Sequence, residues 1–535
     1  MSTASAVKTP ARILTALASL IALAVYLLRL DQAAGLFKDD GWYIVMGKAI
    51  ATGHGLTLIS FPVDGGLYFY PPGFPLVLSA VFAISPDFPE NVWLLKSVSI
   101  IALAAAGYAI YRLALLRDLP QSIAALIAFC TVLAPSWVFL ATSTVMSECL
   151  FFALQMAALV AAQHALGQEW RNRKALAWVA LLATLSYLTR SAGIVIIVAV
   201  AAYLVMHRQL WRALSFVLLV AVMVTPWTLY QRDLRSKAPA AVQEKLPKGY
   251  GSQIRQRAAG TDTQSKIAAR ELPLRIWQNV IVIIAADTGA LLLPAVFRTA
   301  SESGEEVIDL TNVAWVPHDY IGWGKGTMGN ALGTKLLSLL ASLVILTGYF
   351  LSSQKKFGLL EIFTPLFLAT IVIWPGPTFR YLLPLSPLFL YYFVIGLKAW
   401  LSSLQAGASH EWMFPRAALL CILALYLYDH GGYIAARQQP ATEAAHPDWL
   451  RKFEASKAAA GWIRANTAEK EIVTGDNLPM TYLYTGRKTD KCRIKECRQQ
   501  GIRFYLRQQD IYDFPAQDIR YQSPIYNQVR VAELN

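Results

Sequence analysis

The chain has 535 residues, of which 56% are hydrophobic and only 15% are charged, and its mean hydropathy is +0.41. Soluble domains carry about 25% charged residues, so this composition excludes an ordinary soluble protein and indicates a protein that crosses a membrane many times. The formal net charge of +14 is compatible with nucleic acid, but no zinc-knuckle spacing or RNA-binding signature supports that partner, and none is expected. Basic residues beside apolar segments are instead typical of membrane surfaces.

A series of apolar segments predicts the spans, because a membrane-crossing helix needs about 20 mostly apolar residues. The first segment follows Lys8 and Arg12 like a signal peptide. It is too long and lacks a small-residue cleavage site, so we interpret it as an uncleaved span. The predicted fold class is an α-helical polytopic membrane protein with about eleven spans, at residues 13–30, 92–115, 122–140, 149–166, 175–188, 192–206, 214–229, 336–351, 359–374, 382–398 and 417–427.

The short basic loops predict the orientation of the chain. With the N-terminus in the cytoplasm, the loops that carry Arg112 with Arg117, Arg208 with Arg212, and three similar groups all lie on the cytoplasmic face, as the positive-inside rule requires. Three larger polar regions then share the outer face: the first outer loop (31–72), the long outer loop (231–330) and the C-terminal tail. We therefore predict a transmembrane module at 1–433 and a soluble outer domain at 434–535. In a bacterium this corresponds to an inner-membrane protein with its large loops in the periplasm.

Two shorter apolar stretches and the tail complete the predicted fold. Residues 74–84 are too short to cross the membrane and predict a helix lying at the interface. Residues 280–297 are interrupted by Asp287 and Pro294, so a re-entrant hairpin and a true span both remain open. The tail reads as a small α/β domain, with helices at 453–465 and 478–484 and strands at 471–475, 501–506 and 529–533.

Cys492 and Cys497 lie close together in this polar tail. A disulfide between them is possible if the tail is outside the cytoplasm, and two free thiols are the alternative.

The first outer loop carries two adjacent acids, Asp39 and Asp40, shortly after the first span. A carboxylate pair next to lipid costs free energy unless the protein uses it, although such acids can also merely keep a loop in water. Further along, Tyr70 precedes two prolines that fix the backbone. Aromatic side chains in this position suit a membrane interface or a sugar ring.

Four motifs follow one another in order: Asp-Asp-x-x-Tyr at 39–43, Pro-Pro at 71–72, Met-Ser-Glu at 146–148 and Leu-Thr-Arg at 188–190. Together they resemble the GT-C superfamily of glycosyltransferases, and more narrowly the group of protein O-mannosyltransferases and lipid A aminoarabinose transferases. The tail shares the resemblance at 462–467 and 482–487. It implies an inverting transferase that takes a sugar from a polyprenyl-phosphate donor on the outer face and passes it to an envelope glycan, lipid or protein.

The resemblance also implies roles for individual residues. Asp39 is the expected general base, which removes a proton from the attacking hydroxyl, and Asp40 is its catalytic neighbour or a residue that orients the loop. Arg190 and Arg380 are expected to hold the lipid phosphate, because an arginine can bind phosphate through two hydrogen bonds. The remaining residues expected at the substrate are Glu148, Tyr43, Tyr70 and Tyr381. Tyr70 stands where relatives of the aminoarabinose type have a lysine, which puts that phosphate contact in doubt.

No cofactor is expected, although a divalent metal is possible. His54, His318 and Asp319 could bind one, but they lack the paired-histidine spacing of a zinc site and are interpreted as loop residues. Two other functions remain open. A transporter of lipid-linked sugars predicts ionisable groups deep in the bundle and pseudo-symmetric halves. A transferase of the O-antigen-ligase type predicts histidine and arginine in one large outer loop.

Overall fold

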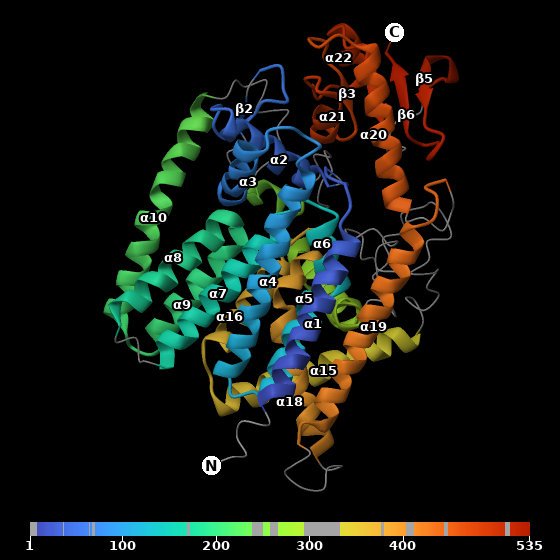
Figure 1. The fold of residues 1–535 in the computed structure, drawn as a ribbon. Helices are drawn as coiled ribbons and strands as arrows, with labels where there is room; N and C mark the ends of the chain where they lie inside the picture. The colour runs from blue at the N-terminus through green and yellow to red at the C-terminus, as the bar shows by residue number, and fades with distance from the viewer. Residues whose placement is uncertain are drawn as a thin grey trace.

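The computed structural model describes most of the chain: residues 8–35, 37–63, 65–66, 70–167, 172–237, 250–256, 266–293, 332–375, 379–402, 411–442, 448–508 and 514–534. It is a bundle of long helices with a small mixed domain at one end (Figure 1). A helix occupies each of the eleven ranges in which a span was predicted. These are α1 (Lys8–Arg29), α4 (Val92–Leu116), α5 (Gln121–Val132) with α6 (Pro135–Thr142), α7 (Glu148–Gly167), α8 (Arg173–Thr189), α9 (Ile194–Met206), α10 (Leu210–Lys237), α15 (Leu332–Lys355), α16 (Leu359–Val372), α18 (Ser386–Leu401) and α19 (Met413–Arg437).

Length and composition qualify seven helices of the described chain as membrane spans, or eight if a bent pair counts as one. The bent pair is α5 and α6, whose axes differ by 51°. Pro135 opens α6, and the break is expected there because proline has no N–H to continue the hydrogen-bond ladder of α5. Several predicted spans, such as α9 and α16, are helical but shorter than 18 residues.

Residues 280–297 were predicted to form either a re-entrant hairpin or a true span. The described part of this stretch lies in a helical region at Ala269–Leu292 that is long and apolar enough to cross a membrane. It consists of α13 (Leu272–Val282), a π-helical turn at Ile283–Asp287 and α14 (Thr288–Leu292). A span is thus compatible with residues 280–292, while Pro294 lies outside the described residues.

The first outer loop contains more regular structure than predicted. The acids at 39 and 40 lie in the first turn of α2 (Lys38–Ala51), not in a loop. A short hairpin, β1 (Thr57–Leu58) with β2 (Gly65–Gly66), follows. The predicted interfacial helix is present as α3 (Gly73–Ile84), which packs against α2. The sequence of α2 hid this helix because it contains two glycines and little amphipathic pattern, so its packing partners must stabilise it.

The C-terminal domain stands at the end of the bundle that also carries α2 and α3 (Figure 1). Its helices are α20 (Asp448–Asn466), α21 (Leu478–Thr485) and α22 (Ile494–Gln499). Its four strands have the order β3-β4-β6-β5, from β3 (Thr474–Gly475), β4 (Phe504–Arg507), β6 (Arg530–Glu533) and β5 (Ile519–Gln522). β3 and β4 are parallel, and the other pairs are antiparallel. The predicted α/β character is confirmed, and β5 and α22 are additional elements.

Cys492 and Cys497 form a disulfide, which answers the question that the sequence left open. The other three cysteines, Cys130, Cys149 and Cys421, are free and belong to the helical bundle.

Candidate active site

Asp39 lies at the N-terminal end of α2, where the helix dipole favours a carboxylate. Its side chain is 44% exposed, so it can meet a ligand. The hydroxyl of Tyr70 donates a hydrogen bond to Asp39 Oδ1 at 2.5 Å. The Nη2 atom of Arg380 lies 3.8 Å from Asp39 Oδ2. The predicted base is therefore an accessible carboxylate with one hydroxyl donor and one guanidinium beside it.

Glu148 joins the two predicted phosphate-binding arginines. It opens α7 and is buried. Arg190, the residue that ends α8, places Nη1 2.9 Å from Glu148 Oε1. Arg380 donates to the same oxygen from Nε at 2.5 Å and also contacts it through Nη2. Because two guanidiniums share one carboxylate oxygen, a net positive charge remains at this point, and Asp39 offsets part of it.

The predicted tyrosines surround this cluster. Arg190 donates to Ser147 Oγ at 3.1 Å, and Ser147 donates to the hydroxyl of Tyr43 at 3.1 Å. The rings of Tyr43 and Tyr70 meet edge to face with centroids 5.2 Å apart. This chain of contacts links the arginine to the tyrosine that holds Asp39, so Tyr43 and Tyr70 form one wall of the site.

Aromatic rings also flank Arg380, which lies in α17 (Phe379–Leu382) and is buried. Its guanidinium carbon lies 5.5 Å from the ring centroid of Phe37 and 5.9 Å from that of Tyr381. Tyr381 itself packs against Trp374 with centroids 5.4 Å apart. The rings supply cation–π contacts that fix the direction of the guanidinium. The structure thus brings together Asp39, Tyr43, Tyr70, Glu148, Arg190, Arg380 and Tyr381.

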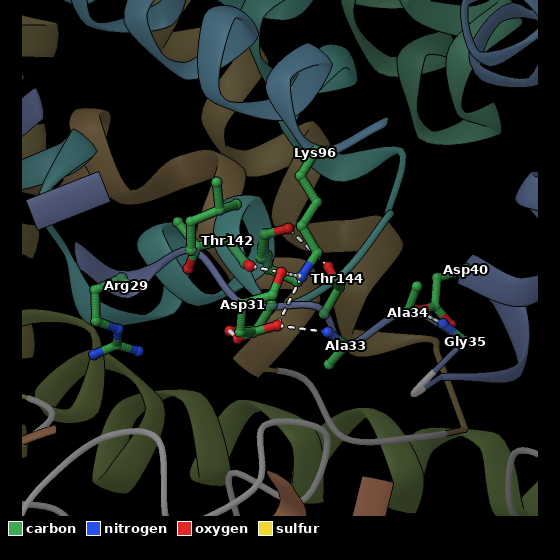
Figure 2. Close-up of polar contacts among 12 residues, drawn as sticks. Arg29, Asp31, Ala33, Ala34, Gly35, Asp40, Lys96, Thr142 and Thr144 are labelled. Carbon is green, nitrogen blue, oxygen red and sulfur yellow. Dashed lines mark hydrogen bonds and ion pairs between the residues drawn. The ribbon is translucent and has the colours of Figure 1, made fainter. Parts of the chain in front are cut away.

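Asp40 occupies a different environment from its neighbour. It is fully buried. Its Oδ2 accepts a hydrogen bond from the backbone N–H of Gly35 at 2.9 Å, and its Oδ1 accepts from that of Gly41 at 3.0 Å. Figure 2 shows the carboxylate of Asp40 directed toward Gly35. These contacts agree with the alternative prediction for Asp40, that it orients the backbone around Asp39.

A buried ion pair between Lys96 and Asp31 lies a few residues before Asp39 and Asp40 in the chain (Figure 2). Lys96 of α4 is fully buried, and its ammonium donates to Asp31 Oδ1 at 2.7 Å, to Asp31 O at 2.7 Å and to Thr142 O at 2.8 Å. Ser143 Oγ and the N–H of Ala33 donate to the carboxylate of Asp31 at 2.6 and 2.8 Å. An ammonium has three donors, so this lysine is fully bonded.

The prediction missed Lys96, Asp31, Ser147 and Phe37. Lys96 carries a usable signal, because a lone charge within an apolar span is costly and is usually retained for a purpose. Asp31 is an acid at the end of the first span, but nothing local couples it to residue 96. Ser147 lies within the Met-Ser-Glu motif, where only the acid attracted notice. Phe37 carries no chemical signal, since its role depends on the position of an arginine 343 residues later in the chain.

The described part of the chain contains no group of three or more His, Cys, Asp or Glu residues that could hold a metal ion. His54 contacts Thr52 Oγ1 through Nδ1 at 3.0 Å and is exposed, in agreement with its interpretation as a loop residue. His318 and Asp319 lie outside the described residues.

Comparison with solved structures finds the same fold in two groups of membrane enzymes. ArnT from Cupriavidus metallidurans, a lipid A aminoarabinose transferase, matches in its apo state with a TM-score of 0.60 and 12% identity, over 98% of each chain. Its complex with undecaprenyl phosphate matches with a TM-score of 0.57, over 97% of this chain and 98% of that one. The AglB oligosaccharyltransferase from Archaeoglobus fulgidus matches in its apo form with a TM-score of 0.50 and 13% identity, over 89% of this chain and 64% of that one.

Neither a protein-family model nor a curated protein matches the sequence. The fold is nevertheless the one that ArnT adopts, in agreement with the fold that the order of the sequence motifs predicted. Within that fold the resemblance to ArnT extends over nearly the whole chain, including the C-terminal domain.

Proposed function

We propose that this protein is a membrane glycosyltransferase that takes a sugar from a polyprenyl-phosphate donor. The single observation that carries the proposal is the accessible Asp39 carboxylate held beside Arg380 and the arginine pair on Glu148. This reaction needs a base to take the proton of the acceptor hydroxyl as its oxygen bonds to the sugar. It also needs cations to stabilise the charge on the departing phosphate. The similar fold of ArnT, whose structure holds undecaprenyl phosphate, supports this class of donor.

In the proposed reaction an acceptor hydroxyl oxygen attacks the anomeric carbon of the sugar, and the bond from that carbon to the phosphate oxygen breaks. The proton of the hydroxyl moves to Asp39, and the bonding electron pair leaves with the phosphate. A single displacement of this kind inverts the anomeric centre. Asp39 is suited to the task because its half-exposed carboxylate already accepts one hydrogen bond and keeps further acceptor capacity for the incoming hydroxyl.

Arg190 and Arg380 stabilise the departing phosphate in this proposal. Both guanidiniums contact one oxygen of Glu148, which orients them without neutralising both charges. The Nη2 atom of Arg380 lies 3.8 Å from Asp39 Oδ2, so a phosphate bound at Arg380 would lie close to the base. Tyr43, Tyr70 and Tyr381 line the sugar side, where aromatic faces suit a pyranose ring.

We further propose that the site faces the outer side of a bacterial inner membrane, with residues 1–433 as the catalytic module and 434–535 as a periplasmic domain. The basic short loops, the disulfide in the C-terminal domain and the location of α2 at the same end of the bundle as that domain support this orientation. The acceptor would then be an envelope glycan, lipid or protein. The similar structures of ArnT and of an oligosaccharyltransferase favour the transferase over the transporter and ligase alternatives.

The test incubates the purified protein with polyprenyl-phosphate sugars and an envelope extract and measures the release of free polyprenyl phosphate. We expect release by the unaltered protein and a loss of about 10²- to 10⁴-fold in Asp39→Asn, the range of a removed general base. Asp87→Asn, at an exposed acid outside the site, is the matched control and should retain full activity. Unchanged release by Asp39→Asn would refute the assignment of the base.

A further inference from the structure

The C-terminal domain touches the membrane module at the segment that carries the catalytic acid. We call this the acid segment, meaning residues 31–35 and 37–41. α21 packs against α2 and against the residues just before it. In Figure 1 these two helices lie next to each other at the junction of the bundle and the domain. This contact raises the question of what the domain does for the site.

Two side chains of α21 and its cap bind backbone carbonyls of the acid segment. Asn477 Nδ2 donates to Gly35 O at 2.8 Å, and the hydroxyl of Tyr484 donates to Ala34 O at 3.3 Å. Burial raises the pKa of Tyr484, so its hydroxyl keeps the proton that it donates. Gly35 is the residue whose N–H holds Asp40. The domain therefore binds the carbonyl of the residue whose amide orients the acid pair.

The helix also approaches the acid segment closely in two places where only glycine fits. A Cβ on Gly41 would lie 2.7 Å from Pro479 Cβ, which is closer than real contacts allow. Gly35 has a φ of +80°, and a Cβ there would lie 3.3 Å from Met480 Cβ. Glycine accepts both the positive φ and the close approach. The backbone on each side of Asp39 is thus pressed directly against α21.

α21 is itself fixed to the sheet of the domain. Asp476, between β3 and α21, accepts hydrogen bonds from the hydroxyl of Tyr505 at 2.6 Å and from the N–H of Gln508 at 2.7 Å. Asn477 caps the helix by accepting from the N–H of Met480 at 3.2 Å. Contacts therefore run without interruption from β4 through Asp476 and Asn477 to Gly35.

On the opposite side, the bundle holds the beginning of the acid segment. The fully bonded ammonium of Lys96 fixes Asp31. The segment is therefore attached at one end to α4 and along the rest to α21, and Asp39 lies between the contacts that α21 makes with Gly35 and Gly41. A carboxylate must be held within about 0.5 Å of its productive position to act efficiently, and a displacement of about 1 Å can cost a hundredfold in rate.

We infer that the C-terminal domain is a positioning element for the reaction: α21, through Asn477 and its contact with Gly41, holds the acid segment so that Asp39 faces the substrate. The expected effect on catalysis rests on the proposed function. The inference that α21 holds the acid segment in place does not depend on that function. It gives the domain a role in catalysis that needs no contact with donor or acceptor.

The test uses Asn477→Ser in the full-length protein. A serine can still cap α21, but its shorter side chain cannot reach Gly35 O. Asn466→Ser is the matched control, because Asn466 Nδ2 also donates to a backbone carbonyl, that of Trp462 at 2.8 Å, but does so at the exposed end of α20. Amide hydrogen exchange of peptides covering residues 31–41 is measured first, followed by the kinetics of polyprenyl-phosphate release.

We expect exchange in residues 31–41 to be about five- to tenfold faster in Asn477→Ser, the effect of one lost hydrogen bond, and unchanged in Asn466→Ser. The kcat should fall by a similar factor while the KM for the donor stays constant, because Asn477 holds the segment of the base and not the arginines that bind the phosphate. A second variant, Gly41→Ala, should lower kcat by about a hundredfold by pushing α2 away from Pro479.

Unchanged exchange in both variants would overturn the inference, as would an equal rise in exchange for Asn466→Ser. A variant that changes the KM for the donor but not kcat would also contradict a positioning role. If the unaltered protein releases no polyprenyl phosphate, the proposed function fails, and the exchange measurement still decides whether the domain holds the acid segment.

Discussion

Two clusters of arginine and glutamate lie inside this bundle, and they differ in how far their charged groups are exposed. In one, Arg117 contacts Glu361 Oε1 at 2.5 Å, and both side chains are almost fully buried, at 3% and 0% exposure. In the other, Glu148 bonds two arginines, and its neighbour Asp39 is 44% exposed. The same residue types thus form a closed pair in one region and an open site in the other.

The closed pair ties helices together. Arg117 follows α4 and donates to Ser352 Oγ of α15 at 2.9 Å and to the hydroxyl of Tyr391 of α18 at 3.1 Å. Glu361, in the first turn of α16, accepts from Ser352 at 2.8 Å and from the N–H of Gly358 at 3.0 Å. Both carboxylate oxygens are bonded within the protein. A charge pair buried in this way stabilises the packing of the bundle and exposes no charged group to a substrate.

The open cluster keeps capacity for a ligand. Arg190 is 17% exposed and Asp39 is 44% exposed. The comparison teaches that a cluster of charges in a membrane protein can meet a ligand when some of its charged groups are exposed. Three substitutions test this distinction, in addition to those proposed above.

The largest effect should come from breaking the closed pair with Arg117→Met. This substitution leaves Glu361 as an uncompensated buried charge, which costs about 3–5 kcal/mol. We expect a clearly lower midpoint of thermal unfolding in detergent, with unchanged donor KM in the molecules that remain folded. Arg112→Met, at an exposed arginine near the same end of α4, is the control. A normal midpoint combined with a raised donor KM would instead show that Arg117 acts in donor binding, as Arg190 is proposed to do.

In the open cluster, we expect Arg190→Gln to change donor binding and not stability, the reverse of the effect expected for Arg117→Met. Charge-assisted hydrogen bonds to phosphate contribute about 1.5–3 kcal/mol, so the donor KM should rise about ten- to a hundredfold. The unfolding midpoint should change little because Arg190 is partly exposed. Arg173→Gln, at the exposed opposite end of α8, should leave donor kinetics unaltered. Loss of stability without a change in KM would show that Arg190 belongs with the closed type.

The smallest effect is expected from Tyr70→Phe, which removes only the hydroxyl that donates to Asp39. One hydrogen bond contributes about 0.5–1.5 kcal/mol, so kcat should fall by about five- to tenfold, with the donor KM and the unfolding midpoint unchanged. Tyr108→Phe, on the exposed face of α4, provides the comparison. If kcat stays at the level of the unaltered protein, the orientation of Asp39 does not depend on Tyr70.

The candidate site shows how far sequence reasoning reached. Asp39, Glu148, Arg190 and Arg380 could be selected because charged residues next to apolar spans are costly and therefore informative. Glu361 had the same property but no interpretable partner, and only the structure pairs it with Arg117. Lys96 carried the same signal and was missed. In each case the sequence identifies a charge that needs a partner, and the partner lies too far along the chain to be inferred.

Helix α2 shows the same difference between what local sequence predicts and what tertiary contacts decide. Its apolar neighbours among the spans were predicted because lipid requires every backbone N–H and C=O to bond within the segment, which dictates a helix. α2 has two acids and two glycines and gives no such signal. Its helical state depends on α3 and α21, which pack on it from other parts of the chain. Short elements that are stabilised by their neighbours lie beyond local patterns.

The sequence by itself determined a polytopic helical membrane protein with a small α/β domain and a motif order that resembles the GT-C superfamily, because hydropathy and motif spacing are local properties. Only the tertiary structure decided which charges meet, which of two adjacent acids faces outward, and that a helix of the C-terminal domain lies against the acid segment. Those outcomes depend on distances between residues hundreds of positions apart, such as 39 and 380. Such distances follow from the packing of whole helices rather than from the residues beside each charge.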